Sequence, residues 1–405
     1  MSQKLIANAR ELLGDTRDSQ STAVFAPGRV NLIGEHTDYN EGFVLPCALP
    51  IGTGIAVRPR TDGKIHAVSR HVSSTQLLRD EIDVDQPIDR KDNNFWGNYL
   101  RGVIVAMQRS DVRVAGADVA IVGDIPQGAG LSSSASLTVG IARALLVACH
   151  PSLAPGVTSQ QIARWAQWSE HHFADCQCGL MDQMTAAVAS SGEAMLLDCR
   201  SLESRRIRLP SELAILVAHS GVERKLAAGE YNLRRRQCAM AAQRLGRTSL
   251  RGLDLSLLTA RANDLPEIEL RRARHVLTEN LRVTRAVKAI ESGDLLELGS
   301  CLRESHLSLR DDFEVSVLQV DALVDHLNHL IDCEARGLGG ARMTGGGFGG
   351  CVVAMVESSA ATVVEVELRR YLSARVARPL VLRMKHTQSK RWESESDCGV
   401  REGWR

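Results

Sequence analysis

The spacing of apolar residues along the chain predicts a mixture of helices and strands. The first residues, MSQKLIANARELLGD, place apolar side chains at helical intervals and predict an amphipathic helix. Residues 22–57 instead hold short β-rich runs separated by Gly and Pro, which is typical of a sheet whose loops carry function. A helix that begins at Thr158 or Ser159, either of which can cap it, should extend to about residue 175, and Gly179 then breaks the chain.

The remaining elements follow the same two periods. Helices are expected at 94–108, 131–149, 180–189 and repeatedly within 223–335. Strands are expected at 117–122, 194–197, 214–218 and, after a glycine turn, 351–356. No internal repeat or low-complexity linker divides the chain. A length of 405 residues favours two or three domains, and we divide the chain into two, 1–200 and 201–405, at a boundary near 195–210.

Composition narrows the class of protein. Hydrophobic residues make up 44% of the chain and charged residues 24%, as in ordinary folded proteins. Lys and Arg number 49 against 48 Asp and Glu, so no overall field attracts nucleic acid or an anionic membrane, and an anionic ligand needs a local site. The best apolar run, 139–149, is interrupted by Arg143 and is too short to cross a bilayer.

The ten cysteines are scattered through a long chain without an export signal, so we expect a cytoplasmic protein with reduced thiols. The pair Cys176-Gln-Cys178 lacks the spacing of a zinc knuckle and has no second pair. Ordinary buried thiols are therefore expected at this pair, and metal ligation is the less favoured alternative.

The stretch PGRVNLIGEHTDY, residues 27–39, places four polar residues of different chemistry around one short apolar core. They are Arg29, Glu35, His36 and Asp38. A plain strand does not need such a mixture, so the stretch predicts a binding site.

A second stretch, GDIPQGAGLSSSAS at 123–136, lies between a predicted strand and a predicted helix. Gly128 and Gly130 let a backbone approach a ligand closely, and the serines at 132–134 open a helix, whose N-terminus attracts anions. Serine at a helix start is common in itself, but the complete run predicts a phosphate loop. The run has no lysine of the Walker type, so Mg²⁺ is implied to balance a triphosphate, held by a serine hydroxyl and one carboxylate.

Two carboxylates are candidates for chemistry. The helical period turns Glu170 towards the protein, where an isolated carboxylate is costly unless it is paired or bound to metal, although the period alone favours a partly exposed edge position. Asp182 falls in the first turn of its helix, where it can simply stabilise the helix dipole. A third pattern, Gly345-x-Gly347-x-x-Gly350, imitates a dinucleotide fingerprint but leads into a strand, so we reject that interpretation.

Taken together, these segments resemble the GHMP family of small-molecule kinases, and within it the galactokinases. The resemblance covers nearly the whole chain and rests on residues 27–46, 126–136 and 342–354, with support from 178–184. It implies an α+β, two-domain GHMP kinase fold. An N-terminal α/β domain like ribosomal protein S5 and a C-terminal ferredoxin-like domain with the glycine motif 344–350 would then enclose the active site in the cleft between them.

The resemblance also implies an activity, the transfer of the ATP γ-phosphoryl group to the anomeric hydroxyl of α-D-galactose. The product, galactose 1-phosphate, would enter galactose catabolism by the Leloir pathway, and the expected partners are galactose and ATP, with the chain acting as a monomer. Two alternatives stay open: a kinase for N-acetylgalactosamine or another GHMP substrate, and a sensor that binds sugar and ATP without turnover.

The residues that match the family's motifs receive their roles from the resemblance. The implied sugar contacts are Glu35, His36, Thr37, Asp38, Gly179, Asp182 and Tyr231. The implied nucleotide contacts are Trp96 near the adenine, and Gly128, Ala129, Gly130, Leu131, Ser132, Ser133 and Ser134 around the phosphates. Ser134 and Glu170 would hold Mg²⁺, and Asp182 and Arg29 would carry catalysis. A carboxylate is a weak base for a sugar hydroxyl, so Asp182 either takes the proton late in the transfer or mainly orients the hydroxyl. The polar ending 383–405 does not resemble the family.

Overall fold

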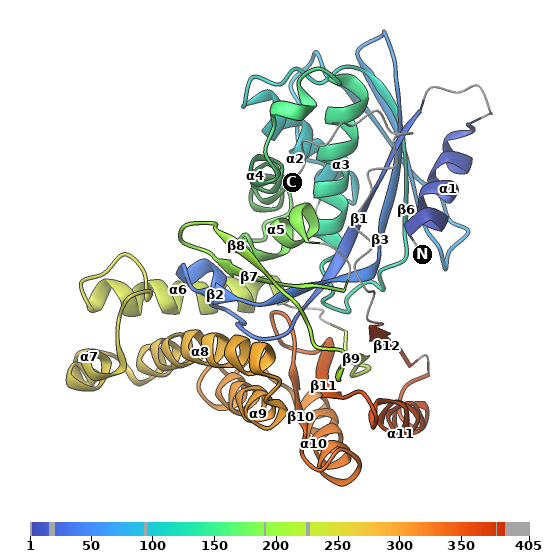
Figure 1. Ribbon diagram of the computed structural model, residues 1–405. Coiled ribbons are helices and arrows are strands. Elements are labelled where there is room, and N and C mark those ends of the chain that lie inside the picture. The colour runs from blue at the N-terminus through green and yellow to red at the C-terminus, as the bar shows by residue number, and fades with distance from the viewer. Residues whose placement is uncertain are drawn as a thin grey trace.

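The computed structural model describes residues 2–15, 21–92, 95–189, 192–223, 227–377 and 379–384. Their strands form two sheets, and helices pack on both (Figure 1). The strands of the first sheet are β1 (Thr22–Asn31), β2 (Phe43–Val44), β3 (Pro46–Pro59), β4 (Lys64–His71), β5 (Leu78–Asp83), β6 (Ala117–Gly123), β7 (Ala194–Asp198) and β8 (Ser204–Ile207). They run in the order β2-β7-β3-β6-β4-β5, with β1 beside β3 and β8 beside β7.

The helices of the N-terminal half cover the two faces of this sheet. The first, α1 (Ser2–Leu13), lies alone on one face, and the others gather on the opposite face (Figure 1). These others are α2 (Gly97–Gln108), α3 (Ser133–Cys149), α4 (Ser159–Phe173) and α5 (Met181–Val188). Thr158 caps α4 by accepting a hydrogen bond from the Gln161 amide, which confirms the expected start of that helix.

The second sheet is antiparallel, with the strand order β10-β11-β9-β12. Its strands are β9 (Leu213–His219), β10 (Gly339–Met343), β11 (Cys351–Glu357) and β12 (Val381–Met384). Its helices are α6 (Ala227–Arg244), α7 (Leu255–Ala260), α8 (Glu267–Ser292), α9 (Leu295–Asp311), α10 (Leu318–Glu334) and α11 (Ala361–Ser373). The chain passes from the first sheet to the second between Ile207 and Leu213, and the division at 200/201 stays a prediction. Apart from β12, the unusual C-terminal ending lies outside the described residues.

One hydrophobic cluster joins the two halves of the molecule. The cluster contains Val30, Leu32 and Ile33 of the motif at residues 27–39. They pack with Val283 of α8 and Val353 of β11. The short apolar core of that motif therefore packs between the two halves of the molecule and holds them together. Its polar residues lie at the same junction as a consequence.

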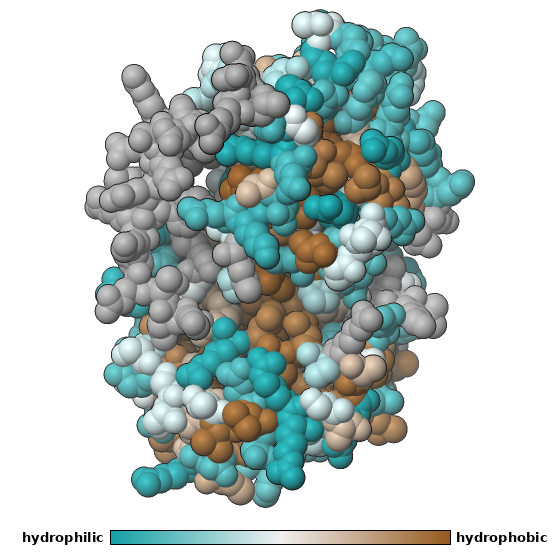
Figure 2. Space-filling model, turned by 90° about the vertical axis from the view of Figure 1, so that its right-hand side faces the viewer, coloured by the Kyte–Doolittle hydropathy of each residue, from teal (hydrophilic) through white to brown (hydrophobic). Residues whose placement is uncertain are grey.

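Polar side chains surround the apolar ones on the face that carries α1 and α11 (Figure 2). Apolar side chains are exposed along the middle of that face, but they do not cover it. Among the described helices, none combines the length and the apolar character needed to cross a membrane.

Candidate active site

A bulge in β1 brings the first site residue into position. The register of β1 against β3 shifts between Pro27 and Arg29, and such a shift re-aims the side chain that follows. Gly28 sits at the shift, where a Cβ atom would lie 2.7 Å from the Leu131 carbonyl oxygen. Because no side chain intervenes, the Arg29 amide donates to that same carbonyl at 3.1 Å. The strand is thus docked directly on the predicted phosphate loop.

The side chain of Arg29 binds Asp182 of α5 through two parallel hydrogen bonds. Its Nε donates to Oδ1 at 2.7 Å and its Nη2 donates to Oδ2 at 2.6 Å, while Nη1 donates to the Gly130 carbonyl at 2.8 Å. The Ser132 hydroxyl also donates to Oδ2 at 2.6 Å. Arg29 is only 5% exposed, so this charge pair is shielded and held in one geometry. The two residues predicted to carry catalysis therefore meet, and they meet on the phosphate loop.

The phosphate loop has the backbone of an anion site. Gly128 and Gly130 have φ values of 71° and 74°, in the left-handed region that glycine adopts without strain, and Ser132 follows at 60°. Ser132 does not cap α3 with its side chain, because its hydroxyl is engaged with Asp182. The first-turn amides of α3 and the positive end of its dipole are left for a ligand. Ala129 and Leu131 are buried beneath the loop, and Ser133 is exposed at its mouth.

The two residues predicted to hold a metal also lie together. Glu170 of α4 is 3% exposed, so it is turned inward and does not take the partly exposed edge position that the helical period alone favours. Burial raises the pKa of Glu170 to about 7, although hydrogen bonds from Gln183 and Ser134 oppose that shift. The Gln183 amide donates to Glu170 at 2.7 Å. A buried carboxylate beside a hydroxyl and a phosphate loop is the oxygen donor set that Mg²⁺ prefers.

Asp38 and Gly179 approach each other next to Asp182. Asp38 begins a short 3₁₀ turn, Asp38–Asn40, and a Cβ atom on Gly179 would lie 2.0 Å from its carboxylate oxygen. Glycine at 179 is therefore required for this contact. Burial, and next the charge of Asp182, raise the pKa of Asp38 to about 7. Three of the predicted sugar contacts thus form one cluster of polar groups.

The raised pKa of Asp38 predicts a stability that depends on pH. In the unfolded chain an aspartate ionises near pH 4, so between pH 4 and pH 7 the folded protein holds a proton that the unfolded protein has lost. Stability therefore falls as the pH rises through this window. Between pH 5 and pH 8, the free energy of unfolding should fall in the wild type by about 2 kcal/mol more than in Asp38→Asn, after allowance for the partial exposure of Asp38. Urea unfolding at both pH values measures this difference, and an equal change in the exposed-site control Asp325→Asn would contradict it.

Aromatic rings from both halves surround His36. Its Nδ1 lies 2.8 Å from the Tyr39 hydroxyl, and its ring lies 5.3 Å from that of Tyr231 and 4.6 Å from that of Phe313, between centroids. His36 has a φ of 62° and is 3% exposed, so the surrounding packing fixes an unfavourable backbone. Tyr231, on α6, is thereby brought beside the N-terminal motif, as a shared sugar pocket requires.

Glu35 and Thr37 are positioned differently from the other predicted sugar contacts. Glu35 is 1% exposed, and its carboxylate accepts from Asn31 at 2.9 Å and from the amide of Gly345 at 2.7 Å. The Thr37 hydroxyl is buried and lies 2.8 Å from the Gly34 carbonyl, inside its own loop. Both side chains shape the motif from within, and their contact with a sugar stays a prediction.

Sequence reasoning missed the partner of Glu35, which is Arg342 of β10. The Nη2 atom of Arg342 lies 2.5 Å from Glu35 in a pair that is 0% and 1% exposed, and Nη1 donates to the Leu32 carbonyl at 3.1 Å. Glu279 of α8 accepts from the Gly34 amide at 3.0 Å. Although its burial favours the neutral form, Arg282 and Arg342 hold the pKa of Glu279 at about 2. Arg342 stands two residues before the glycine motif 344–350, and nothing local in the sequence marks it as the residue that connects the two halves.

The glycine turn itself ends in β11, which confirms that it is not a dinucleotide loop. Gly347 has a φ of 84°, and a Cβ atom there would lie 2.4 Å from the Val315 carbonyl oxygen. A Cβ atom on Gly346 would lie 3.1 Å from the ring of Tyr231. The turn thus packs closely against the wall of the predicted sugar pocket.

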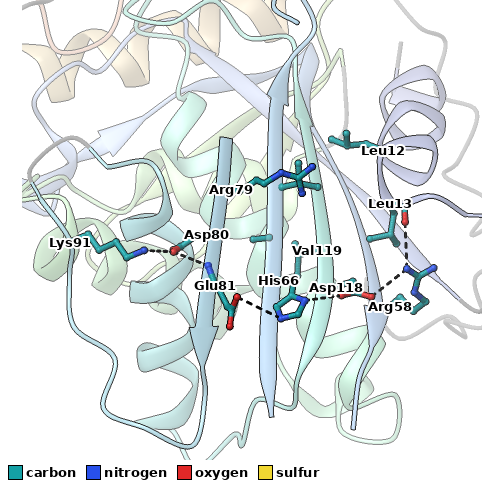
Figure 3. A pocket seen from close by; sticks show the side chains of 12 residues that line it. Leu12, Leu13, Arg58, His66, Arg79, Asp80, Glu81, Lys91, Asp118 and Val119 are labelled. Atoms are coloured by element: carbon teal, nitrogen blue, oxygen red, sulfur yellow. Dashed lines mark hydrogen bonds and ion pairs between the residues drawn. The ribbon is translucent and has the colours of Figure 1, made fainter. Parts of the chain in front are cut away.

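Trp96 stands immediately before α2 and is partly buried against the N-terminal core. Its contact with an adenine stays a prediction. A shallow cavity of about 580 Å³ lies elsewhere, between the end of α1 and strands β3 to β6 (Figure 3). Several of its charged groups already pair with one another, for instance Lys91 with Asp80 at 2.6 Å, and it contains no predicted site residue. The candidate site is therefore the cluster around Arg29 and Asp182.

Three family models match the chain. They are the galactokinase galactose-binding signature at residues 11–59, the N-terminal domain of GHMP kinases at 98–190 and the C-terminal domain of GHMP kinases at 286–374. The first contains Arg29 and the polar motif, and the second contains the phosphate loop, Glu170 and Asp182.

Solved structures agree with these matches. The chain is 30% identical to a Lactococcus lactis galactokinase complexed with galactose, over 94% of this chain and 96% of that one, with a TM-score of 0.83. A Methanococcus jannaschii mevalonate kinase shares the fold at 18% identity over 92% and 100% of the two chains, with a TM-score of 0.60. These findings confirm the two-domain GHMP kinase fold. The chain belongs to the galactokinases, within the GHMP family of kinases.

Proposed function

We propose that the chain transfers the γ-phosphoryl group of ATP to the anomeric hydroxyl of galactose, giving galactose 1-phosphate and ADP. The observation that carries the proposal is the bonding of Asp182 to Arg29 and to Ser132, which joins the predicted sugar cluster to the phosphate loop. Donor and acceptor sites that share one ion pair are suited to a direct transfer between them.

The acceptor hydroxyl would bind at a specific atom of Asp182. Its Oδ2 already accepts from both Arg29 and Ser132, whereas Oδ1 accepts, among the residues that the structure describes, only from Arg29 Nε. A carboxylate oxygen has two lone pairs, so Oδ1 keeps one for the hydroxyl. Asp182 would orient the hydroxyl there and take its proton as the new P–O bond forms. Arg29 would stabilise the negative charge that spreads between acceptor and donor in a loose transition state.

The sugar would be held by the polar groups next to Asp182. The carboxylate of Asp38 adjoins it, Gly179 packs against that carboxylate, and Tyr231 adds a hydroxyl and an apolar ring face. Because each sugar hydroxyl both donates and accepts, such a mixture can distinguish epimers by the bonds that the wrong one leaves unmade.

The chemistry of the donor set fits a hard divalent cation. Ser134 and Glu170 would hold Mg²⁺, and the ion would neutralise charge on the phosphates when bound. The loop itself contributes no lysine to that task. Gln183 would keep the Glu170 carboxylate oriented through its 2.7 Å hydrogen bond.

Removing the charge of Glu170 should weaken the metal site selectively. In Glu170→Gln, we expect the Mg²⁺ concentration for half-maximal activity to rise by roughly tenfold or more, because one anionic ligand becomes neutral. The KM for galactose should change little. An Mg²⁺ titration at saturating ATP and galactose measures this shift, and an unchanged midpoint would remove Glu170 from the metal site.

Adding one methyl group to Gly179 should damage sugar binding. Gly179→Ala would place a Cβ atom 2.0 Å from the Asp38 carboxylate, so the two side chains must separate. We expect the galactose KM to rise about tenfold or more while ATP affinity is retained. Gly156→Ala is the matched control, since a Cβ atom there meets nothing within 4 Å. Equal galactose KM values in the two variants would contradict the close packing at Gly179.

The decisive experiment follows ATP consumption over a panel of free sugars, with phosphorus NMR to locate the transferred phosphate. A signal at the anomeric position of galactose supports the proposal. Faster turnover of N-acetylgalactosamine would assign the chain to that sugar. Binding of galactose and ATP without ADP release would identify a sensor.

A further inference from the structure

Two thiols and a carboxylate converge beside the proposed metal site. One carboxylate oxygen of Glu170 and the Sγ atoms of Cys176 and Cys178 all lie within 4.8 Å of one another. Sequence spacing disfavours zinc here because no second cysteine pair is present. The third ligand comes instead from the preceding helix, α4, which ends three residues before Cys176.

The loop that carries the thiols is held in place on both sides. The Cys178 carbonyl accepts from Gln167 at 3.1 Å and lies 2.8 Å from His171 Nε2, while the Cys176 amide donates to the Glu170 carbonyl at 3.1 Å. From α6, Arg235 donates to the carbonyl of the residue between the cysteines at 2.6 Å. The thiols are therefore presented to Glu170 by an anchored loop, and both are partly exposed, so an ion can reach them.

A buried acceptor beside the cluster lacks a partner. Gln183 is 1% exposed, and its Nε2 donates to Glu170 at 2.7 Å and to Cys178 Sγ at 3.3 Å. Its Oε1 has no hydrogen-bond partner within the part of the chain that the structure describes. A water molecule on a bound ion would satisfy this oxygen and complete a fourth position.

We propose that Cys176, Cys178 and Glu170 form a binding site for a soft divalent cation such as Zn²⁺. Ligand atoms around a tetrahedral ion with bonds of 2.3 Å lie about 3.8 Å apart, so closure needs side-chain movements of about 1 Å. Each thiol gives its proton to solvent as its sulfur binds the ion, so occupation releases two protons from the cysteines.

Occupation of this site has a consequence for catalysis, which rests on the proposed function. Glu170 is also the proposed Mg²⁺ ligand, so an ion held at the thiols competes with Mg²⁺ for its carboxylate. Zn²⁺ at the thiols therefore withdraws Glu170 from Mg²⁺ and inhibits phosphoryl transfer. Excess Mg²⁺ should relieve the inhibition.

Cadmium titration of the reduced protein tests the site without reference to activity, because cadmium–thiolate bonds absorb in the ultraviolet. The wild type should develop this absorbance with one Cd²⁺ bound, and Cys176→Ser should weaken binding by roughly tenfold or more. Cys333→Ser is the matched control, because Cys333 is exposed and lies 3.8 Å from His329, a pair able to attract cadmium adventitiously. Binding that survives in Cys176→Ser and disappears in Cys333→Ser would overturn the proposal as an adventitious ion only.

Inhibition is then measured at fixed ATP and galactose. Zn²⁺ should inhibit the wild type at a concentration roughly tenfold below that needed for Cys176→Ser, whose activity in Mg²⁺ alone should equal that of the wild type. Equal inhibition of the wild type and Cys176→Ser would refute the proposal that Zn²⁺ at the thiols inhibits phosphoryl transfer. A wild type that is inactive in Mg²⁺ alone would refute the proposed function, while the cadmium titration would still decide whether the site exists.

Discussion

Asp182→Ala should lose turnover almost completely while it still binds ATP. We expect kcat to fall by about 10³-fold or more, because the variant loses the group that orients the acceptor hydroxyl and takes its proton. Removal of the carboxylate also leaves Arg29 without its two short hydrogen bonds, and its charge then lies beside the phosphate loop. ATP affinity should accordingly be unchanged or higher. ADP release with galactose measures the first effect, and a calorimetric ATP titration measures the second.

Two companion variants separate the possible roles of Asp182. Asp182→Asn keeps the size of the side chain and can orient a hydroxyl but cannot take its proton. Activity near that of the alanine variant identifies a base, whereas activity within about tenfold of the wild type identifies an orienting group. Ser132→Ala removes only the hydrogen bond to Oδ2 and should cost about tenfold or less. Full activity of Asp182→Ala would exclude Asp182 from the chemistry.

The fold was predictable wherever a buried face left a periodic pattern. The helices α4 and α5 have a clear stripe, a cap at Thr158 and a break at Gly179, and their limits were predicted to within a few residues. The strand β5 escaped prediction for a physical reason. Its inward positions include Asp80, which is buried because Arg101 and Lys91 bind it at 2.8 and 2.6 Å, so no apolar alternation is left to detect.

The site was predictable where its residues belong to local motifs. The anion loop follows from glycines and serines at the start of a helix, whereas the helical period placed Glu170 on or beside the inward face and did not by itself predict its full burial. The meeting of Arg29 with Asp182 has no such local sign, since a contact between distant segments leaves no trace in either one, and only the family resemblance predicted it. Gln183 and Arg342 were missed for the same reason, because their importance lies entirely in the partners that the fold brings to them.

Arg342→Leu should destabilise the protein more than any surface substitution. Its loss leaves the Glu35 carboxylate, which is 1% exposed, without a cationic partner, and breaking a buried pair in this way costs about 3–5 kcal/mol. Arg342 also donates to the Leu32 carbonyl, so the connection between the two halves weakens. Urea unfolding measures the loss. Arg369→Leu is the matched control, because Arg369 pairs with Glu365 at the surface and its loss should cost about 0–1 kcal/mol.

The double variant Glu35→Gln with Arg342→Leu tests the cause. If an uncompensated charge produces the loss, a neutral Gln at position 35 should restore much of the stability. No restoration would attribute the loss to packing instead.

Glu35→Gln alone then decides the predicted sugar contact. The carboxylate already accepts three hydrogen bonds, from Asn31, Thr344 and Gly345, and forms an ion pair with Arg342, so little of it is left for a sugar hydroxyl. A lowered stability with an unchanged galactose KM would show that Glu35 serves the junction of the two halves. A raised galactose KM at unchanged stability would show that Glu35 contacts the sugar.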